Sequence, residues 1–220
     1  MRTFTSIFIL WLGVCRSVHA QPPVDPKKWE VAGSAALFYA TPGDDDNTYG
    51  DNWYFARRYA ATIAHYWTEN LKTEVEYATS GEGSIYRQEF RSLPGNPPNY
   101  PYSVESFHRL EQASVRMVWQ FGKNRWVHPY VSGGLIGDRE RRRIHAPQQY
   151  QYVSGRSGEP IVLVPAIDSQ PAWDYRIGVT AGTGAKLYIS PNAFFNVGAV
   201  GSYSRPAATL SFLAGFGIDF

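Results

Sequence analysis

The sequence predicts an all-β fold, an eight-stranded antiparallel up-and-down transmembrane β-barrel. The first observation is the composition, because 15 Tyr, 12 Phe, 7 Trp and 20 Gly among 220 residues, beside 2 Met and 1 Cys, favour strands over helices. The second is the alternation of apolar and polar residues with a period of two along most of the chain. The third is a regular exchange of short and long connections, which is expected when tight turns lie on one side of a membrane and larger loops on the other.

The first twenty residues have the features of a secretory signal peptide. Arg2 precedes an apolar run over residues 4–14, and Val18 and Ala20 supply small residues at a cleavage site, the pattern of an exported precursor. Residues 21–28 are expected to form a flexible periplasmic lead, and residues 29–220 the barrel. Cleavage removes two of the 21 basic residues and none of the 19 acidic ones, so the mature chain is neutral and nucleic-acid binding is not expected.

Eight segments alternate in this way, and they set the predicted strands: 29–41, 54–67, 71–80, 105–121, 126–139, 172–189, 194–204 and 207–220. The third is the clearest, because apolar residues or Thr at odd positions alternate with charge at even positions from Leu71 to Tyr77. In the fifth, both faces mix Gly with apolar residues, so its lipid-facing side stays open. The faces expected to contact lipid elsewhere are Trp29, Val31, Leu37 and Tyr39 in the first segment; Tyr59, Ile63 and Trp67 in the second; Val75 and Tyr77 in the third; Val115, Met117, Trp119 and Phe121 in the fourth; Trp173, Tyr175, Ile177, Val179 and Leu187 in the sixth; Phe195, Val197 and Tyr203 in the seventh; and Phe212, Phe216, Ile218 and Phe220 in the last.

The connections and the aromatic residues separate a membrane barrel from a soluble β-sandwich, which alternation alone would also suit. The joints at 68–70, 122–125 and 190–193 are short, whereas those at 42–53, 80–104 and 139–171 are long and polar. Trp29 near the short turns and Tyr39 near the long loops are ten residues apart, about 25 Å along a tilted strand. This is the height of an outer-membrane apolar band, and aromatic rings prefer the headgroup level at both of its edges.

The residues also resemble a known family, the small eight-stranded outer-membrane β-barrels that include the OmpA-like barrel and opacity-type proteins. The motifs are Pro129-Tyr130-Val131 with Gly133-Gly134, and Gly182-x-Gly184 with Ile189-Ser190-Pro191. The last segment, with Phe212, Phe216, Ile218 and Phe220, is similar to the assembly signal of bacterial outer-membrane proteins. The resemblance covers residues 29–220. It implies a location in the outer membrane of a Gram-negative bacterium, export through the signal peptide and contact with the outer-membrane assembly machinery.

The charges on the inner face are expected to form a structural ion network. Eight strands enclose an interior that side chains can fill, and an unpaired charge there would cost several kcal/mol. With the third and fourth strands adjacent, Glu74 or Glu76 can reach Arg116. The expected members are Lys72, Glu74, Glu76, Arg116, Arg176 and Lys186. The alternative is a narrow channel or small-ligand binder, in which these residues line an ion path.

We expect no enzymatic activity, no cofactor and no metal. Lipid A deacylases of this architecture carry a His-x-Ser-Asn element, which the residues after His65, His108 and His128 do not match. A Ser–His–acid site assembled across strands stays open, because triads are recognised by geometry rather than by order. Such a site would favour the alternative of a barrel-embedded enzyme acting on lipid A or phospholipid. The acidic run at 44–47 lacks the spaced ligands of a calcium loop.

Two features point to partners of a monomeric structural or surface-interaction protein. Arg139, Arg141, Arg142 and Arg143 fall where the fifth strand leaves the membrane, and guanidinium groups suit the phosphates of outer-membrane lipid and lipopolysaccharide. The alternative is a solvated loop stem with Glu140 as a partner of the arginines. Residues 161–164 and 149–153 are expected to form a hairpin above the membrane, so the 139–171 loop is a candidate site for a surface ligand.

Overall fold

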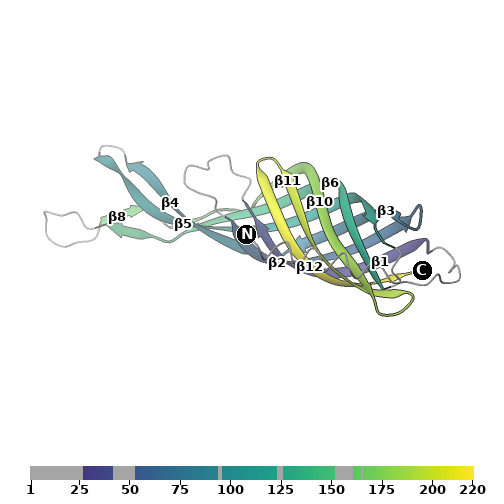
Figure 1. The fold of residues 1–220 in the computed structure, drawn as a ribbon. Helices are drawn as coiled ribbons and strands as arrows, with labels where there is room; N and C mark the ends of the chain where they lie inside the picture. Colours follow the sequence, from purple (N-terminus) through teal and green to yellow (C-terminus); the bar gives the residue numbers. More distant parts are fainter. Residues whose placement is uncertain (1–26, 42–52, 94–95, 123–125, 152–160, 165) are drawn as a thin grey trace, which may run out of the picture.

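The computed structural model describes residues 27–41, 53–93, 96–122, 126–151, 161–164 and 166–220. Eight strands form a closed ring: β1 (Trp29–Ala40), β2 (Tyr54–Tyr66), β3 (Leu71–Ser80), β5 (Asn96–Gln120), β6 (Val127–Ala146), β10 (Ala172–Tyr188), β11 (Ala193–Ser204) and β12 (Ala207–Asp219). Each pairs antiparallel with the next, and β12 pairs with β1 with Ala214 opposite Ala35 (Figure 1). The predicted eight-stranded antiparallel barrel is confirmed. Closure leaves the ring without an unpaired edge, as hydrocarbon requires.

The sheet continues well beyond the ring on the side of the long connections. β4 (Gly83–Leu93) pairs with the first half of β5, and this hairpin runs out to the left of the ring in Figure 1. At the end of β6, β9 (Ile167–Asp168) pairs with His145 and Ala146. The expected bounds of the fourth and fifth strands were therefore too short, since β5 begins at Asn96 and β6 ends at Ala146. Beyond the membrane no face of a ladder contacts lipid, so the alternation that marks a lipid-facing strand is not required there.

A second, small sheet follows β6. β7 (Gln149–Gln151) and β8 (Ile161–Val164) pair antiparallel with one another, which is the hairpin expected from the β-prone run at 161–164. The predicted signal peptide and most of the lead, residues 1–26, lie outside the described residues, as does the acidic run at 44–47. No helix in the described ranges is long and apolar enough to cross a membrane.

The outer face of the ring is apolar and carries aromatic side chains at two levels. Between the two levels lie exposed aliphatic residues such as Ile63, Val115 and Leu135. Ring contacts join neighbouring strands within each level, as between Tyr39 and Phe55 at 5.3 Å. The members near the short turns are Trp29, Trp67, Trp119, Phe121, Trp126, Phe195 and Phe220, and those near the long connections are Tyr39, Phe55, Tyr77, Trp173, Tyr175 and Tyr203, with Phe107 half-buried among the latter.

The strand whose orientation the sequence left open is now assigned. In β6 the odd positions Val131 and Leu135 face outward, 45% and 64% exposed, whereas Ile136 is buried in the interior. Glycine occupies the outward positions 133 and 137 and also the inward position 134. At Gly134 the neighbouring strand comes so close that an added Cβ would lie 2.0 Å from the carbonyl oxygen of Val115. The glycines that blurred the pattern thus include one that the inner packing requires.

Candidate functional site in the barrel interior and at its outer rim

The lower interior is centred on Glu30 of β1. Its Oε2 accepts from Lys72 Nζ at 2.6 Å, from the Tyr66 hydroxyl at 2.9 Å and from Lys186 Nζ. Lys186 also lies 3.6 Å from Asp219. Four of these five side chains, all except Tyr66, are 1% exposed. Charges buried so completely are stabilised only by this mutual pairing, so the cluster fixes β1, β2, β3, β10 and β12 to one another.

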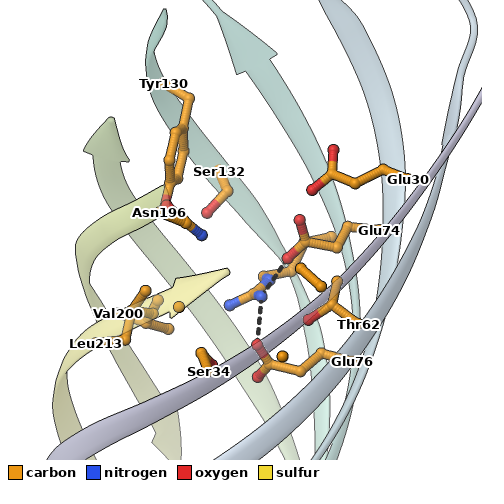
Figure 2. Close-up of a pocket in the computed structure, with 14 residues that line it drawn as sticks. Glu30, Ser34, Thr62, Glu74, Glu76, Tyr130, Ser132, Asn196, Val200 and Leu213 are labelled. Carbon is orange, nitrogen blue, oxygen red and sulfur yellow. Dashed lines mark hydrogen bonds and ion pairs between the residues drawn. The ribbon is translucent and has the colours of Figure 1, made fainter. Parts of the chain in front are cut away.

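The middle of the interior is organised by two arginines. Arg116 donates to Glu74 and, at 2.8 Å, to Glu76, as the dashed lines in Figure 2 mark for the two carboxylates. Arg58 also donates to Glu76 and, through Nε, to Gln112 Oε1 at 3.0 Å. All six residues predicted for the interior therefore face inward, and Glu30, Arg58, Asp138, Glu140 and Asp219 join them. Glu30 and Asp219 are single acids near strand ends, Arg58 follows another arginine, and Asp138 and Glu140 are interleaved with arginines, so no simple charge pattern marks them.

A small cavity separates the acidic wall from the opposite strands. Glu30, Glu74 and Glu76 line one side, and Tyr130 and Asn196 line the other (Figure 2). The Tyr130 hydroxyl donates to Asn196 Oδ1 at 2.9 Å. The cavity volume is about 20 Å³, which is room for about one water molecule. It is far smaller than the cavities that bind organic ligands.

Above this polar zone the interior becomes apolar. Phe38, Tyr54 and Leu110, none more than 2% exposed, pack with Ala40, Ala56 and Ile85 in one cluster. Phe38 and Tyr54 meet edge to face, with ring centroids 6.2 Å apart. Ile85 comes from β4, so the external hairpin contributes to this layer. The members come from β1, β2, β4 and β5, and Leu110 lies opposite the charged Glu140 of β6 in the register.

A second polar group lies at the outer mouth, beside the apolar layer. His108 Nδ1 is 2.7 Å from Glu140 Oε1, and His108 Nε2 is 3.0 Å from Ser106 Oγ. The other oxygen of Glu140 accepts from Arg176 Nη2 at 2.5 Å. Tyr54 stacks on the imidazole at 5.2 Å. A His-x-Ser-Asn element does not describe this arrangement, because β5 carries Ser-x-His and the carboxylate comes from β6.

The arginine run divides between the two faces of β6. Arg139, Arg141 and Arg143 take the outward positions, whereas Arg142 lies opposite His108 in the register and so shares the inner face. Arg139 stacks over Trp173 at 3.8 Å. Glu140, which the alternative of a solvated loop stem named as a partner of the run, is 4% exposed and faces inward, where Arg176 contacts it. Further outward contacts are Arg139 with Glu111 at 3.5 Å, Arg139 over Tyr175 at 5.8 Å, Arg141 over Trp173 at 6.0 Å and Arg143 over Phe107 at 4.9 Å.

The residues of the proposed assembly signal lie on the outer face of β12 or directly after it. Phe212, Phe216, Ile218 and Phe220 are each about half exposed. The Phe216 ring meets Phe195 at 5.7 Å. At the end of the chain, the backbone N–H of Phe220 donates to Trp29 O at 2.9 Å, so the last residue takes part in barrel closure.

The described residues offer no metal site, and the external hairpin carries a polar side-chain pair. No group of three or more His, Cys, Asp or Glu side chains in the described ranges could hold a metal ion. On the external hairpin, a hydrogen bond to the Glu105 carboxylate raises the pKa of the exposed Tyr86 hydroxyl. This pair joins β4 to β5 outside the barrel.

Comparison with known proteins identifies the fold. No family model matches the sequence, and a search of curated proteins finds no match. A major outer-membrane protein from Thermus thermophilus is similar with a TM-score of 0.51 at 10% identity, over 87% of this chain and 99% of that one. Ail, the attachment invasion locus protein of Yersinia pestis, is similar with a TM-score of 0.50 at 10% identity, over 88% and 99%. The chain thus has the fold of the small outer-membrane β-barrels, and its apolar exterior with two aromatic levels locates it in a bacterial outer membrane.

Proposed function

We propose that the protein is a monomeric, non-conducting barrel that anchors an external extension for contact with other molecules at the bacterial surface. The observation that carries this proposal is the filled interior, in which a paired ion network and an apolar cluster occupy the lumen. The alternative of a narrow channel or small-ligand binder needs a continuous polar lumen instead. Export by the signal peptide and insertion by the outer-membrane assembly machinery, with Phe212, Phe216, Ile218 and Phe220 as its signal, belong to the same proposal.

The ion network supports a closed lumen because its charges are cross-linked rather than arranged in a line. Glu30 joins Lys72 to Lys186, and Arg116 joins Glu74 to Glu76. A permeating ion would have to separate such pairs, and leaving one partner of a buried pair uncompensated costs about 3–5 kcal/mol. An ion would also pass the side chains of Phe38, Tyr54 and Leu110. Among these three, only Tyr54 has a polar group, its hydroxyl, that could replace water around the ion.

Conductance in a planar lipid bilayer tests this point. Purified protein, shown to be folded by faster migration on a cold detergent gel than after boiling, should give no discrete current steps. The Lys186→Ala variant removes one of the two lysines that pair with Glu30 and leaves the apolar cluster unchanged. It should also give no current steps. Stepwise currents from the wild-type protein would overturn the closed-lumen proposal and favour the channel.

The external extension supports a role in surface contact. β5 continues for eleven residues from Phe107 to Asn96, a reach of about 35 Å beyond the upper aromatic level at about 3.3 Å per residue. Its partner β4 and the separate β7–β8 sheet lie on the same side of the ring (Figure 1). A structural barrel needs no such projection, whereas an exposed strand edge can bind an extended partner segment. The 139–171 region is the proposed site for a surface ligand.

The outward arginines support contact with lipopolysaccharide. Arg139 stacks on Trp173, which places a guanidinium group against an aromatic ring at the headgroup level. Such stacking fixes the planar group while leaving donors available for phosphate. Arg141 and Arg143 repeat the arrangement on the same face of β6. Together they form a short cationic stripe on the outer rim.

Binding of lipopolysaccharide micelles to purified protein tests the stripe with a matched control. The triple variant Arg139→Gln, Arg141→Gln, Arg143→Gln should bind more weakly than wild type at low salt, and the difference should shrink as salt screens the charges. The Arg142→Gln variant, which changes the same residue type on the inner face, should bind as wild type does. Equal binding by wild type and the triple variant at low salt would refute lipid contact by this run.

A further inference from the structure

Three side chains at the outer mouth have the mutual geometry of a hydrolytic triad. We propose that Ser106, His108 and Glu140 form an esterase site that acts on short apolar acyl esters entering from the external aqueous side. The hydroxyl oxygen lies 3.0 Å from His108 Nε2, and Nδ1 lies 2.7 Å from Glu140 Oε1. This is the order of atoms that a Ser–His–acid site requires: nucleophile on one ring nitrogen, acid on the other. The proposal goes beyond the anchoring role.

The barrel itself produces this juxtaposition. Ser106 and His108 are two residues apart on β5 and therefore share its inner face. In the pairing of β5 with β6, Glu140 of β6 lies opposite Leu110 of β5. Glu140 is therefore the diagonal neighbour of His108. Diagonal neighbours on one face are within reach of long side chains. All three residues lie on strands rather than in loops, with Ser106 and His108 in the part of β5 that pairs with both β4 and β6.

The hydrogen bonds select the tautomer that catalysis needs. An ionised carboxylate only accepts, so the hydrogen bond runs from Nδ1–H of His108 to Glu140, and Nε2 of a neutral imidazole is then an acceptor. Ser106 Oγ is 3.5 Å from the carbonyl oxygen of Ile85, a longer and weaker contact than its 3.0 Å approach to Nε2. The serine hydroxyl therefore donates to His108, as a nucleophile activated by a general base does.

Two neighbours hold the acid and the base in place. Arg176 Nη2 contacts the second oxygen of Glu140 at 2.5 Å, so one oxygen stays directed at His108. Tyr54 lies over the imidazole with an interplanar angle of 18° and a centroid distance of 5.2 Å. Arg176 and Tyr54 are positioning residues, since neither contacts Ser106. A histidine that served only to neutralise Glu140 would need one ring nitrogen, and here both are engaged.

The surroundings of Ser106 define the class of substrate. Ile85 on β4 and Ile144 on β6 flank it in the register, and Val104, 4% exposed, follows on the same face. These side chains suit a small apolar acyl group. Because the three triad residues face the interior and not the lipid, an ester held in the bilayer cannot reach Oγ. The site therefore fits a soluble ester and not the lipid A or phospholipid substrate considered from the sequence.

The proposed reaction balances with water as the only co-reactant. Ser106 Oγ attacks the ester carbonyl carbon while its proton passes to His108 Nε2, and that proton then goes to the oxygen of the leaving alcohol as the ester bond breaks. Water next attacks the acyl-serine, giving its proton to His108. The acyl–Oγ bond breaks, Ser106 regains the proton, and the carboxylic acid leaves.

The first test is covalent labelling of the purified, folded wild-type barrel in detergent with an alkyl fluorophosphonate, followed by peptide mass spectrometry. Attack by Oγ forms a bond to phosphorus and expels fluoride, so an adduct should appear on Ser106. The Ser106→Ala variant should show no adduct at that peptide. The matched control is Ser114→Ala, another buried serine on the inner face of the same strand, which should leave labelling unchanged.

Hydrolysis of p-nitrophenyl butyrate tests the roles of the other two residues. His108→Gln and Glu140→Gln, each shown to be folded by its gel shift, should slow both labelling and hydrolysis by about 10²–10⁴-fold, the usual loss when general-base catalysis is removed. Vesicles of phospholipid and lipopolysaccharide serve as the bilayer arm and should release no fatty acid. Absence of an adduct on Ser106 in wild type, or labelling indifferent to His108, would overturn the site. Fatty acid release that depends on Ser106 would overturn the assignment to soluble esters.

Discussion

Replacing Glu30 by Gln should destabilise the folded barrel strongly, although the two side chains have the same shape. Glu30 Oε2 is the shared acceptor of Lys72, Lys186 and Tyr66. After the substitution, Lys72 still has Glu74 at 3.1 Å, whereas the nearest carboxylate to Lys186 is Asp219 at 3.6 Å. A neutral amide cannot stabilise two ammonium groups that are excluded from water.

The structure sets the expected magnitude. Removing one partner of a buried ion pair costs about 3–5 kcal/mol. Because each lysine keeps a second carboxylate, we expect the lower end, about 3 kcal/mol, which is about a hundredfold in the unfolding equilibrium. Adding Lys186→Met to Glu30→Gln should recover part of this loss, because an apolar side chain needs no counter-charge and such replacements are often neutral or stabilising.

Urea-dependent unfolding in lipid vesicles, followed by tryptophan fluorescence and by the gel shift, measures these differences. Glu69→Gln in the exposed turn after β2 is the matched control, because it removes the same charge where no buried partner is left behind; it should change stability by less than about 0.5 kcal/mol. The reasoning is refuted if Glu30→Gln is no more destabilising than Glu69→Gln. It is also refuted if the double variant is less stable than Glu30→Gln alone.

Two further predictions concern backbone packing and biogenesis. Gly134→Ala should abolish or severely reduce the folded fraction, because its Cβ would lie 2.0 Å from the Val115 carbonyl oxygen, whereas Gly137→Ala on the same strand, with 3.9 Å to the nearest atom, should fold normally; equal refolding yields would contradict this. Deleting Phe220 should lower the outer-membrane yield in cells more than it lowers refolding of purified chain into detergent, because burial of one exposed ring contributes only a few kcal/mol; an unchanged cellular yield, or equal losses in both measurements, would remove its targeting role.

The ring of the barrel could be predicted because the bilayer imposes a simple rule on sequence. Every strand crossing hydrocarbon must present apolar side chains at alternate positions, so Leu71–Tyr77 and the last strand were unambiguous. The same rule fails outside the bilayer. The first part of β5, from Asn96 onward, continues beyond the bilayer and contains several prolines, and nothing in its alternation marks it as a strand. Its pairing with β4 is a tertiary feature that local pattern does not encode.

Interior charges were predictable on strands where they repeat, as at Lys72, Glu74 and Glu76. Glu30 and Asp219 were missed because each is a single acid at the end of an otherwise apolar or glycine-rich strand. Their register offered a signal, since the two lie directly opposite one another across β1 and β12. Ser106 and His108 also sit at inward positions of one strand. The remaining member, Glu140, lies between arginines in the sequence and was considered only as their partner in the alternative of a solvated loop stem.

The arginine run at 139–143 lies on β6, where odd and even positions face opposite sides of the sheet. This alternation separates two proposed functions. Arg139, Arg141 and Arg143 face the lipid rim, while Glu140 and Arg142 face the interior and lie next to the proposed esterase site. A variant changing all four arginines would alter lipid contact and the neighbourhood of His108 together, so its phenotype would not identify a cause. The triple outward variant should reduce lipopolysaccharide binding and leave labelling of Ser106 unchanged. Glu140→Gln should reduce labelling of Ser106 and leave lipopolysaccharide binding unchanged. If the two effects cannot be separated in this way, the two faces of β6 do not act as independent sites.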